Sequence, residues 1–357
     1  MASVCAPPPD RIAPLITELA AIRAAGLVYA TDEQPGFSRV RRGKGFSYYD
    51  ADGTRITDRG QLARIRALAI PPAYRQVWIC RQANGHLQAT GRDARGRKQY
   101  RYHSQWRRLR DRGKFDQVMA FAAALPRLRR RVRRDLARAG LPADKVVAVL
   151  VGLLDETLVR VGNEEYARAN RSYGLTTLRT RHVRSERNRL RFVFKGKSGQ
   201  ISDVLLDDQR LIRIVRRMQQ LPGQHLFQYL GDEGQACAVD SGMVNDYLRR
   251  TEAGGGASTF SAKDFRTWGA TVLAAGELAA TRLPPDESAR RRQLAATTRN
   301  VAAALRNTPA VCRASYIHPQ VFQGWLDGRL QRDIPAAAAC HSRQLERLTL
   351  RFLKRGR

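Results

Sequence analysis

The chain has 357 residues, of which 43% are hydrophobic, so it is long enough to bury a core in two or three domains. Lysine and arginine number 64 against 32 acidic residues, which gives a formal net charge of +32. Because this excess is spread along the chain, it favours a polyanionic partner such as nucleic acid. The five cysteines are far apart and form no CxxC pair, which disfavours a disulfide framework and a cysteine zinc site.

Two further classes of protein are disfavoured. The sequence has no apolar run of about 18 residues and no signal-peptide pattern. We therefore expect a soluble, cytoplasmic protein with no membrane partner, associated with the nucleoid if its source is bacterial. Metal-dependent chemistry needs clustered carboxylates, whereas the acidic pairs are scattered near turn signals, at 50/52, 207/208 and 232/233. We expect no metal site and no small-molecule cofactor.

The first hundred residues show helical and strand patterns. Apolar residues at helical spacing predict an amphipathic helix over 10–25. Strand-like segments follow at 45–49, 77–80 and 87–90. The last two flank Asn84-Gly85, a strong hairpin signal. These segments predict a small β-rich domain over residues 1–108.

The pattern then becomes helical. A helix is predicted over 115–140, with an apolar stripe formed by Leu125, Leu128, Val132 and Leu136. Its opposite face is rich in arginine, which is compatible either with a solvated surface or with contact to a nucleic-acid backbone. A second helix is predicted over 142–169, and short strands at 175–178, 190–194 and 201–205. The expected fold is α+β, with a mostly helical domain over 109–357 that contains a small antiparallel sheet.

Two segments near the C-terminus carry candidate functional side chains. Ser261 followed by Asp264 is a capping-box pattern, which predicts a helix with Lys263 and Arg266 on one face. Thr308-Pro309 predicts the start of another helix, with Tyr316 in its last turn. A surface ion and a packing tyrosine are the ordinary readings of these residues taken singly.

Two earlier residues extend this set. Arg160 follows an apolar helical run and precedes Gly162, and a buried arginine there is costly without an anion. Lys197 stands in a turn between two predicted strands, from which a long side chain can reach a groove. A plain turn lysine is the ordinary reading of Lys197.

The ordered combination of these residues is more specific than any member. Together with their flanking segments they resemble the type IB DNA topoisomerases, in particular the poxvirus-like and bacterial branch. The resemblance covers about residues 25–320 and rests on Arg160, Lys197, Lys263, Arg266, Asn307 and Tyr316, with the flanks 159–166, 174–178, 194–197 and 96–103.

The resemblance implies an activity and a mechanism. Tyr316 would attack a DNA phosphorus, release a 5′-hydroxyl and leave a 3′-phosphotyrosine, so that supercoils relax before religation without ATP or metal. Arg160 and Arg266 would hold the non-bridging oxygens, and Lys197 would be the general acid, assisted by Lys263. Relatives often carry histidine where this chain has Asn307, so only a hydrogen-bonding role is expected for that amide.

The resemblance also implies how DNA is bound. The partner would be double-stranded DNA, with contacts from Tyr100, Tyr102, Tyr166 and Thr177. Two lobes joined by a short basic segment would close around the duplex as a monomeric clamp.

Two other functions remain open from the sequence. A tyrosine recombinase or integrase shares the arginine, lysine and tyrosine chemistry, but it normally has an HxxR motif where this chain has Lys263-Asp264-Phe265-Arg266. Its N-terminal domain is also expected to be helical rather than β-rich. The non-enzymatic alternative is a basic architectural protein that binds DNA without forming a covalent adduct.

Overall fold

The computed structural model describes residues 18–231, 233–250, 260–340 and 342–356. The chain divides into two compact units, Met1–Lys114 and Phe115–Arg357, and the division falls inside helix α3 (Ser104–Leu136). The fold class is α+β, as predicted. Most of the helix expected over 10–25 lies outside the described residues, but 18–24 are helical. No helix in the described part of the chain is long and apolar enough to cross a membrane.

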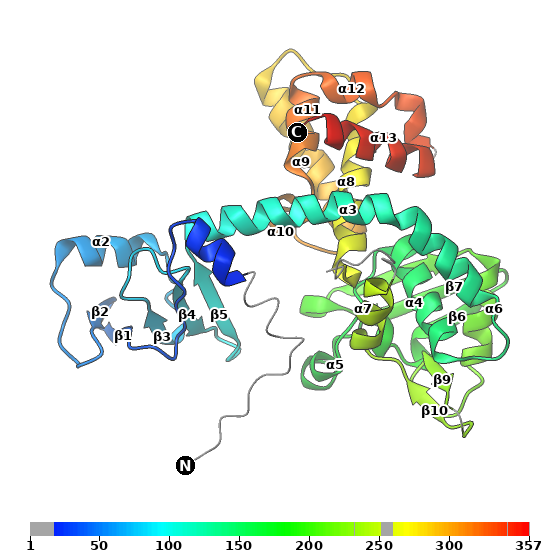
Figure 1. The fold of residues 1–357 in the computed structure, drawn as a ribbon, viewed down its shortest axis with the longest axis horizontal. Coiled ribbons are helices and arrows are strands. Elements are labelled where there is room, and N and C mark those ends of the chain that lie inside the picture. Colours follow the sequence, from blue (N-terminus) through cyan, green and yellow to red (C-terminus); the bar gives the residue numbers. More distant parts are fainter. Residues whose placement is uncertain (1–17, 232, 251–259, 341, 357) are drawn as a thin grey trace. The chain divides into compact units, whose positions relative to one another are not determined.

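The first unit is built on a five-stranded antiparallel sheet with strand order β2-β1-β3-β4-β5 (Figure 1). Its elements are β1 (Phe37–Arg42), β2 (Gly45–Tyr49), α2 (Arg59–Ala67), β3 (Arg75–Ile79), β4 (Leu87–Arg92) and β5 (Lys98–Tyr102). The predicted hairpin is confirmed, because β3 and β4 pair on either side of Asn84-Gly85. Ile65 of α2 packs with Val77, Ile79 and Ala89 in a small core.

The second unit is mostly helical. Its helices beyond α3 are α4 (Ala143–Thr157), α5 (Glu164–Asn170), α6 (Gln209–Met218), α7 (Ser241–Arg249), α8 (Ala262–Ala279), α9 (Glu287–Ala304), α10 (Pro309–Ser315), α11 (Pro319–Leu326), α12 (Arg329–Asp333) and α13 (Ser342–Arg355). Helix α8 contacts α4 and α7 as well as α9 and α11–α13, so it connects the two groups of helices in this unit (Figure 1).

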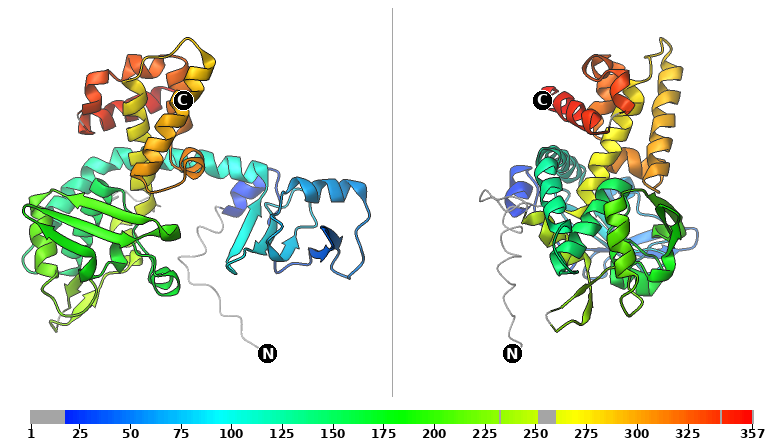
Figure 2. Two further views of the ribbon diagram at one scale, coloured as in Figure 1. Left: turned by 180° about the vertical axis from the view of Figure 1, so that it is seen from behind. Right: turned by 90° about the vertical axis from the view of Figure 1, so that its right-hand side faces the viewer.

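The predicted small antiparallel sheet is present in the second unit. It consists of β6 (Val183–Glu186), β7 (Arg189–Lys195) and β8 (Ile201–Leu206), with β7 in the centre (Figure 2). Buried and exposed residues alternate along β7 and β8, as expected for a sheet with one face on the core. A second, two-stranded sheet, β9 (Gln228–Leu230) with β10 (Ala236–Ala238), was not predicted.

The prediction of one continuous helix over 142–169 was wrong. Helix α4 ends where Leu158 takes a left-handed conformation, with φ 53°, and Gly162 then takes φ 104° before α5 begins. Between α4 and α5, main-chain carbonyls accept hydrogen bonds from residues distant in sequence instead of from the next turn of a helix. The carbonyl of Arg160 accepts from Leu175 N at 2.9 Å, and that of Val161 accepts from Thr176 N at 2.7 Å.

The strand predicted over 175–178 was also wrong. Residues Leu175–Thr177 form a single 3₁₀ turn. The Thr177 hydroxyl bonds both backbone groups of Gly174, which closes the turn locally and leaves the segment unavailable for a sheet ladder.

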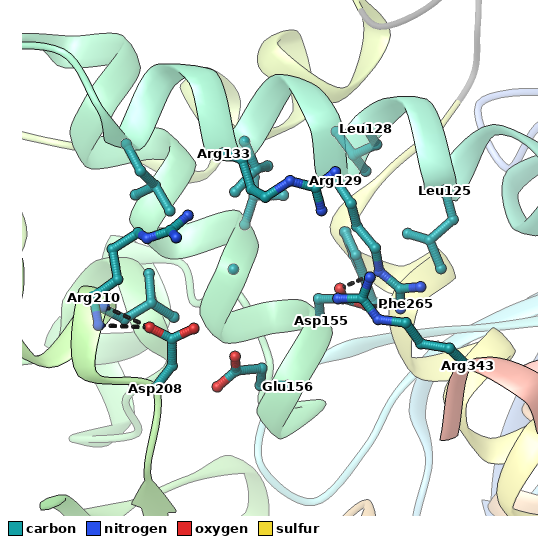
Figure 3. Close-up of a pocket in the computed structure, with 15 residues that line it drawn as sticks. Leu125, Leu128, Arg129, Arg133, Asp155, Glu156, Asp208, Arg210, Phe265 and Arg343 are labelled. Carbon is teal, nitrogen blue, oxygen red and sulfur yellow. Dashed lines mark hydrogen bonds and ion pairs between the residues drawn. The ribbon is translucent and has the colours of Figure 1, made fainter. Parts of the chain in front are cut away.

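The apolar stripe predicted for the long helix is buried, since Leu125 and Leu128 are 1% and 3% exposed. On the arginine-rich face, Arg129 has a structural role. Arg129 pairs with Asp155 of α4 at 2.7 Å and with Glu346 of α13 at 2.6 Å, so it ties three helices together. Arg129 and Asp155 also line a pocket of about 280 Å³ between α3, α4 and α6 (Figure 3).

Candidate functional site

Arg266 is the most deeply placed cation of the candidate site. The predicted capping box is confirmed, because Asp264 accepts from the backbone and hydroxyl of Ser261 at the start of α8. This helix buries Arg266 to 3% exposure and leaves Lys263 exposed. The guanidinium donates to the carbonyls of Leu158 and Leu305, the latter at 2.9 Å.

Arg160 lies on the segment between α4 and α5. It is half-buried, and its guanidinium donates to the carbonyl of Arg306 at 3.3 Å. Both arginines therefore donate to main-chain oxygens at 305–306, and Arg266 also donates to that of Leu158. Helix α8 approaches this region closely at Gly269, where an added Cβ would lie 2.6 Å from the Leu158 side chain.

The charges of these two arginines are electrostatically costly in the free protein. Burial, and after it the charge of Arg266, lower the pKa of Arg160 to about 10. Burial also lowers the pKa of Arg266. Its Nε atom is buried without a hydrogen-bond partner. Desolvated like charges with an unused donor indicate a site prepared for an anion.

Tyr316 lies beside Arg266. Thr308 caps α10 through a bond to Val311 N, and Pro309 occupies the first turn, as predicted. Tyr316 is the residue that ends this helix, and its carbonyl accepts from Thr271 of α8 at 3.2 Å. The Arg266 guanidinium carbon is 5.3 Å from the centre of the half-buried Tyr316 ring. The nearby Tyr316 phenol opposes, without reversing, the lowering of the Arg266 pKa by burial.

Lys197 reaches the same place from the small sheet. It lies in the turn between β7 and β8, where Gly196 N donates to Gln200 O at 2.7 Å, and it is exposed. A small cleft is lined by Lys197 together with Arg160, Arg266 and Arg306. Three of the residues predicted from the sequence thus meet in one cleft, although more than a hundred positions separate the first from the last.

Arg306 belongs to this cleft and was not predicted. The sequence contained one usable signal, because Arg306 directly precedes Asn307, which had been singled out. Asn307 itself is half-buried, and its side-chain oxygen accepts from Thr308 N at 3.1 Å. Neither Asn307 nor Lys263 is among the residues that line the cleft. The roles predicted for both stay predictions.

The four residues predicted to contact DNA have different environments. Tyr100 and Tyr102 stack on β5 of the first unit with ring centres 6.1 Å apart, and Tyr100 is 49% exposed. Tyr166 lies on α5 and is 52% exposed. Thr177 is only 3% exposed, and its hydroxyl is engaged by Gly174. Tyr100 and Tyr166 offer exposed aromatic surface, whereas Thr177 could contact a ligand only after local rearrangement.

Two family models and a curated relative match the sequence of this chain. The family model for the catalytic core of eukaryotic DNA topoisomerase I matches residues 103–329. The model for the N-terminal domain of bacterial DNA topoisomerase IB matches residues 45–93. DNA topoisomerase 1B of Acanthamoeba polyphaga mimivirus is 31% identical over 289 residues, which cover 79% of this chain and 85% of that relative.

Proposed function

Because the chain belongs to the type IB DNA topoisomerase family, we propose that Tyr316 is the nucleophile with which it cuts one strand of duplex DNA. Attack on a backbone phosphorus forms a 3′-phosphotyrosine and releases a 5′-hydroxyl. The cut strand swivels about the intact one, and attack by the same hydroxyl reverses the step. The phosphodiester energy is conserved in the adduct, so ATP is not needed.

The observation that carries this assignment is the position of Arg266 next to the Tyr316 ring. Negative charge on the non-bridging oxygens increases as the phosphorus becomes pentacoordinate. Arg266 and Arg160 are forked donors whose charges are held by carbonyls rather than carboxylates, so they stay available for these oxygens.

The leaving oxygen requires a proton, and Lys197 is our general acid. Its turn at the end of β7 brings the amine to the cleft that holds Arg160 and Arg266. Lys263 would assist through a relay, and the Asn307 amide would donate a hydrogen bond to the phosphate oxygens.

We further propose that the β-rich N-terminal domain, residues 1–108, holds the duplex against the catalytic domain, residues 109–357, as a monomeric clamp. The exposed aromatic rings of Tyr100 and Tyr166, with Tyr102 and Thr177, would contact the DNA. The enzyme would act in the cytoplasm, at the nucleoid if its source is bacterial. The recombinase alternative is not favoured, since both family matches and the relative are topoisomerases.

The test is relaxation of a supercoiled plasmid without recombination sites, in EDTA and without ATP. Denaturation during the reaction should trap a covalent DNA adduct that maps to Tyr316. Tyr316→Phe should abolish adduct and relaxation while DNA binding persists. Tyr74→Phe, which alters a ring packed in the core of the first unit, is the control and should relax DNA normally. An adduct on another residue would refute the assignment.

A further inference from the structure

Arg306 occupies a backbone position that favours glycine. It follows Leu305, the C-cap of α9, and takes a left-handed conformation with φ 50°. Its amide donates to Ala303 O at 3.0 Å, and Asn307 N donates to Ala302 O at 2.8 Å. This is the Schellman pattern of helix termination, in which glycine is the usual residue at the left-handed position. An arginine there is strained, so its side chain needs a reason to be present.

The Arg306 side chain is held weakly. It is half-buried, and its guanidinium donates to two main-chain carbonyls, Ala304 O at 3.3 Å and Asp203 O at 3.2 Å. No carboxylate of the described residues lies within ion-pair distance of it. The nearby carboxylate of Asp203 is instead engaged by Arg191 at 2.6 Å. Burial and the charge of Arg266 both lower the pKa of Arg306.

Arg306 also lies directly in the candidate active site. Arg306 lines the cleft with Arg160, Lys197 and Arg266, and its carbonyl accepts from the Arg160 guanidinium at 3.3 Å. Three arginines and a lysine therefore line one cleft, and no acid is among the residues that line it. Such a concentration of like charge disfavours the free protein and is offset when a phosphate enters.

We propose that Arg306 is a further active-site residue, which leaves its two carbonyl partners when duplex DNA binds and donates to a backbone phosphate in the cleft. This inference rests on the proposed function and adds a cation to it. The main chain of Arg306 positions Arg160, and its side chain contacts the DNA. The two roles are separable, since glycine retains the carbonyl and removes the guanidinium.

Arg306→Gly in the full-length protein tests the proposal. Glycine relieves the left-handed strain, so the variant should melt at an equal or higher temperature. On a Tyr316→Phe background, its affinity for duplex DNA should fall about tenfold at low salt, and the slope of log affinity against log salt should shrink by about 1. In the enzyme that retains Tyr316, Arg306→Gly should slow the formation of the covalent adduct measured in a single turnover. Arg306→Lys should recover the salt slope more fully than the cleavage rate, because lysine retains the charge without the fork.

Arg187→Gly is the matched control. Arg187 is also left-handed, with φ 37°, and lies at the turn between β6 and β7, so the variant loses the same charge and relieves the same kind of strain. It should keep both the salt slope and the cleavage rate. Equal losses in the two variants, or an Arg306→Gly enzyme with unchanged slope and rate, would overturn the proposal. If the parent enzyme formed no adduct at Tyr316, the proposed function would fail instead.

Discussion

At the scale of single residues, Arg129 differs from Arg160 and Arg266 in the groups to which its guanidinium donates. Arg129 is paired with two carboxylates, and those pairs raise its pKa. Arg160 and Arg266 are held by main-chain carbonyls, and burial lowers the pKa of both. A carbonyl orients a guanidinium without neutralising it, whereas a carboxylate would compete with an incoming phosphate. The charge of Arg129 is thus neutralised by its partners, whereas those of Arg160 and Arg266 are not.

The general-acid role proposed for Lys197 can be tested by changing the leaving group of the DNA substrate. Lys197→Ala should slow cleavage of ordinary DNA by about 10²–10⁴-fold, the usual contribution of a general acid. A 5′-thiolate leaves without a proton, so DNA with a 5′-bridging sulfur at the cleavage site should restore most of the rate. Single-turnover cleavage of both substrates measures this. Equal defects on the two substrates would assign Lys197 to phosphate binding instead.

At the scale of elements, the turn between α4 and α5 positions Arg160. It is locked against the 3₁₀ turn at Leu175–Thr177 by a close approach of Gly174 to Gly162. A Cβ on Gly174 would lie 2.5 Å from the Gly162 backbone and 2.7 Å from the carbonyl of Arg160. Main-chain atoms cannot move aside as a flexible side chain can, so this contact holds the arginine in place.

Gly174→Ala should therefore lower the free energy of unfolding by about 1–3 kcal/mol, the usual range for overpacking. It should also slow cleavage, since Arg160 would shift. Chemical denaturation and adduct formation provide the two readouts. Gly113→Ala is the control, because Gly113 lies in α3 with open space around it and should gain about 0.5–1 kcal/mol of stability. If Gly174→Ala cleaved DNA at the normal rate, the contact between Gly174 and Gly162 would not be needed to position Arg160.

The pocket between α3, α4 and α6 makes stability depend on pH (Figure 3). Glu156 lies there near the end of α4, and desolvation, followed by the charges of Asp208, Asp155 and Asp207, raises its pKa to about 7. Because the folded-state pKa is raised, the favourable contribution of the protonated form is present below the unfolded-state value and is lost as pH rises through about 7.

Glu156→Gln should behave like the protonated side chain at every pH. Its melting temperature should match that of the parent protein near pH 4, below the unfolded-state value, and exceed it at pH 8. The effect should be modest, because part of the Glu156 side chain remains exposed to solvent. Thermal melts across this pH range provide the measurement, and a constant difference between the two proteins would contradict the assignment.

At the scale of the whole molecule, the net charge of +32 favours contact with a long stretch of DNA backbone. Footprinting of the full chain and of the separate segments 1–108 and 109–357 tests the clamp. The full chain should protect a longer stretch than 109–357, which should still form the Tyr316 adduct at higher protein concentration. Identical footprints for the full chain and 109–357 would remove the first unit from DNA binding.

Local patterns predicted many of the elements correctly. Asn84-Gly85 indicated a hairpin, Ser261 with Asp264 a helix start, and Thr308-Pro309 another. Such signals depend on a few neighbouring residues. The break after α4 was missed because Leu158 has no local tendency to end a helix. Its carbonyl accepts from Arg266 of α8, and the carbonyls of residues 160–161 accept from residues 175–176. These compensating partners are not local in sequence.

The sequence by itself determined the fold class, the family resemblance and the residue types needed for strand cutting, because motifs and periodicity are local. Only the tertiary structure decided that Arg160, Lys197 and Arg266 line one cleft, that Tyr316 lies beside Arg266, and that Arg306 joins them. Convergence of this kind depends on packing between α8, the segment after α4 and the end of α9. Two of those contacts, from Arg266 to Leu158 and from Arg160 to Arg306, join positions more than a hundred residues apart, which no window along the chain contains.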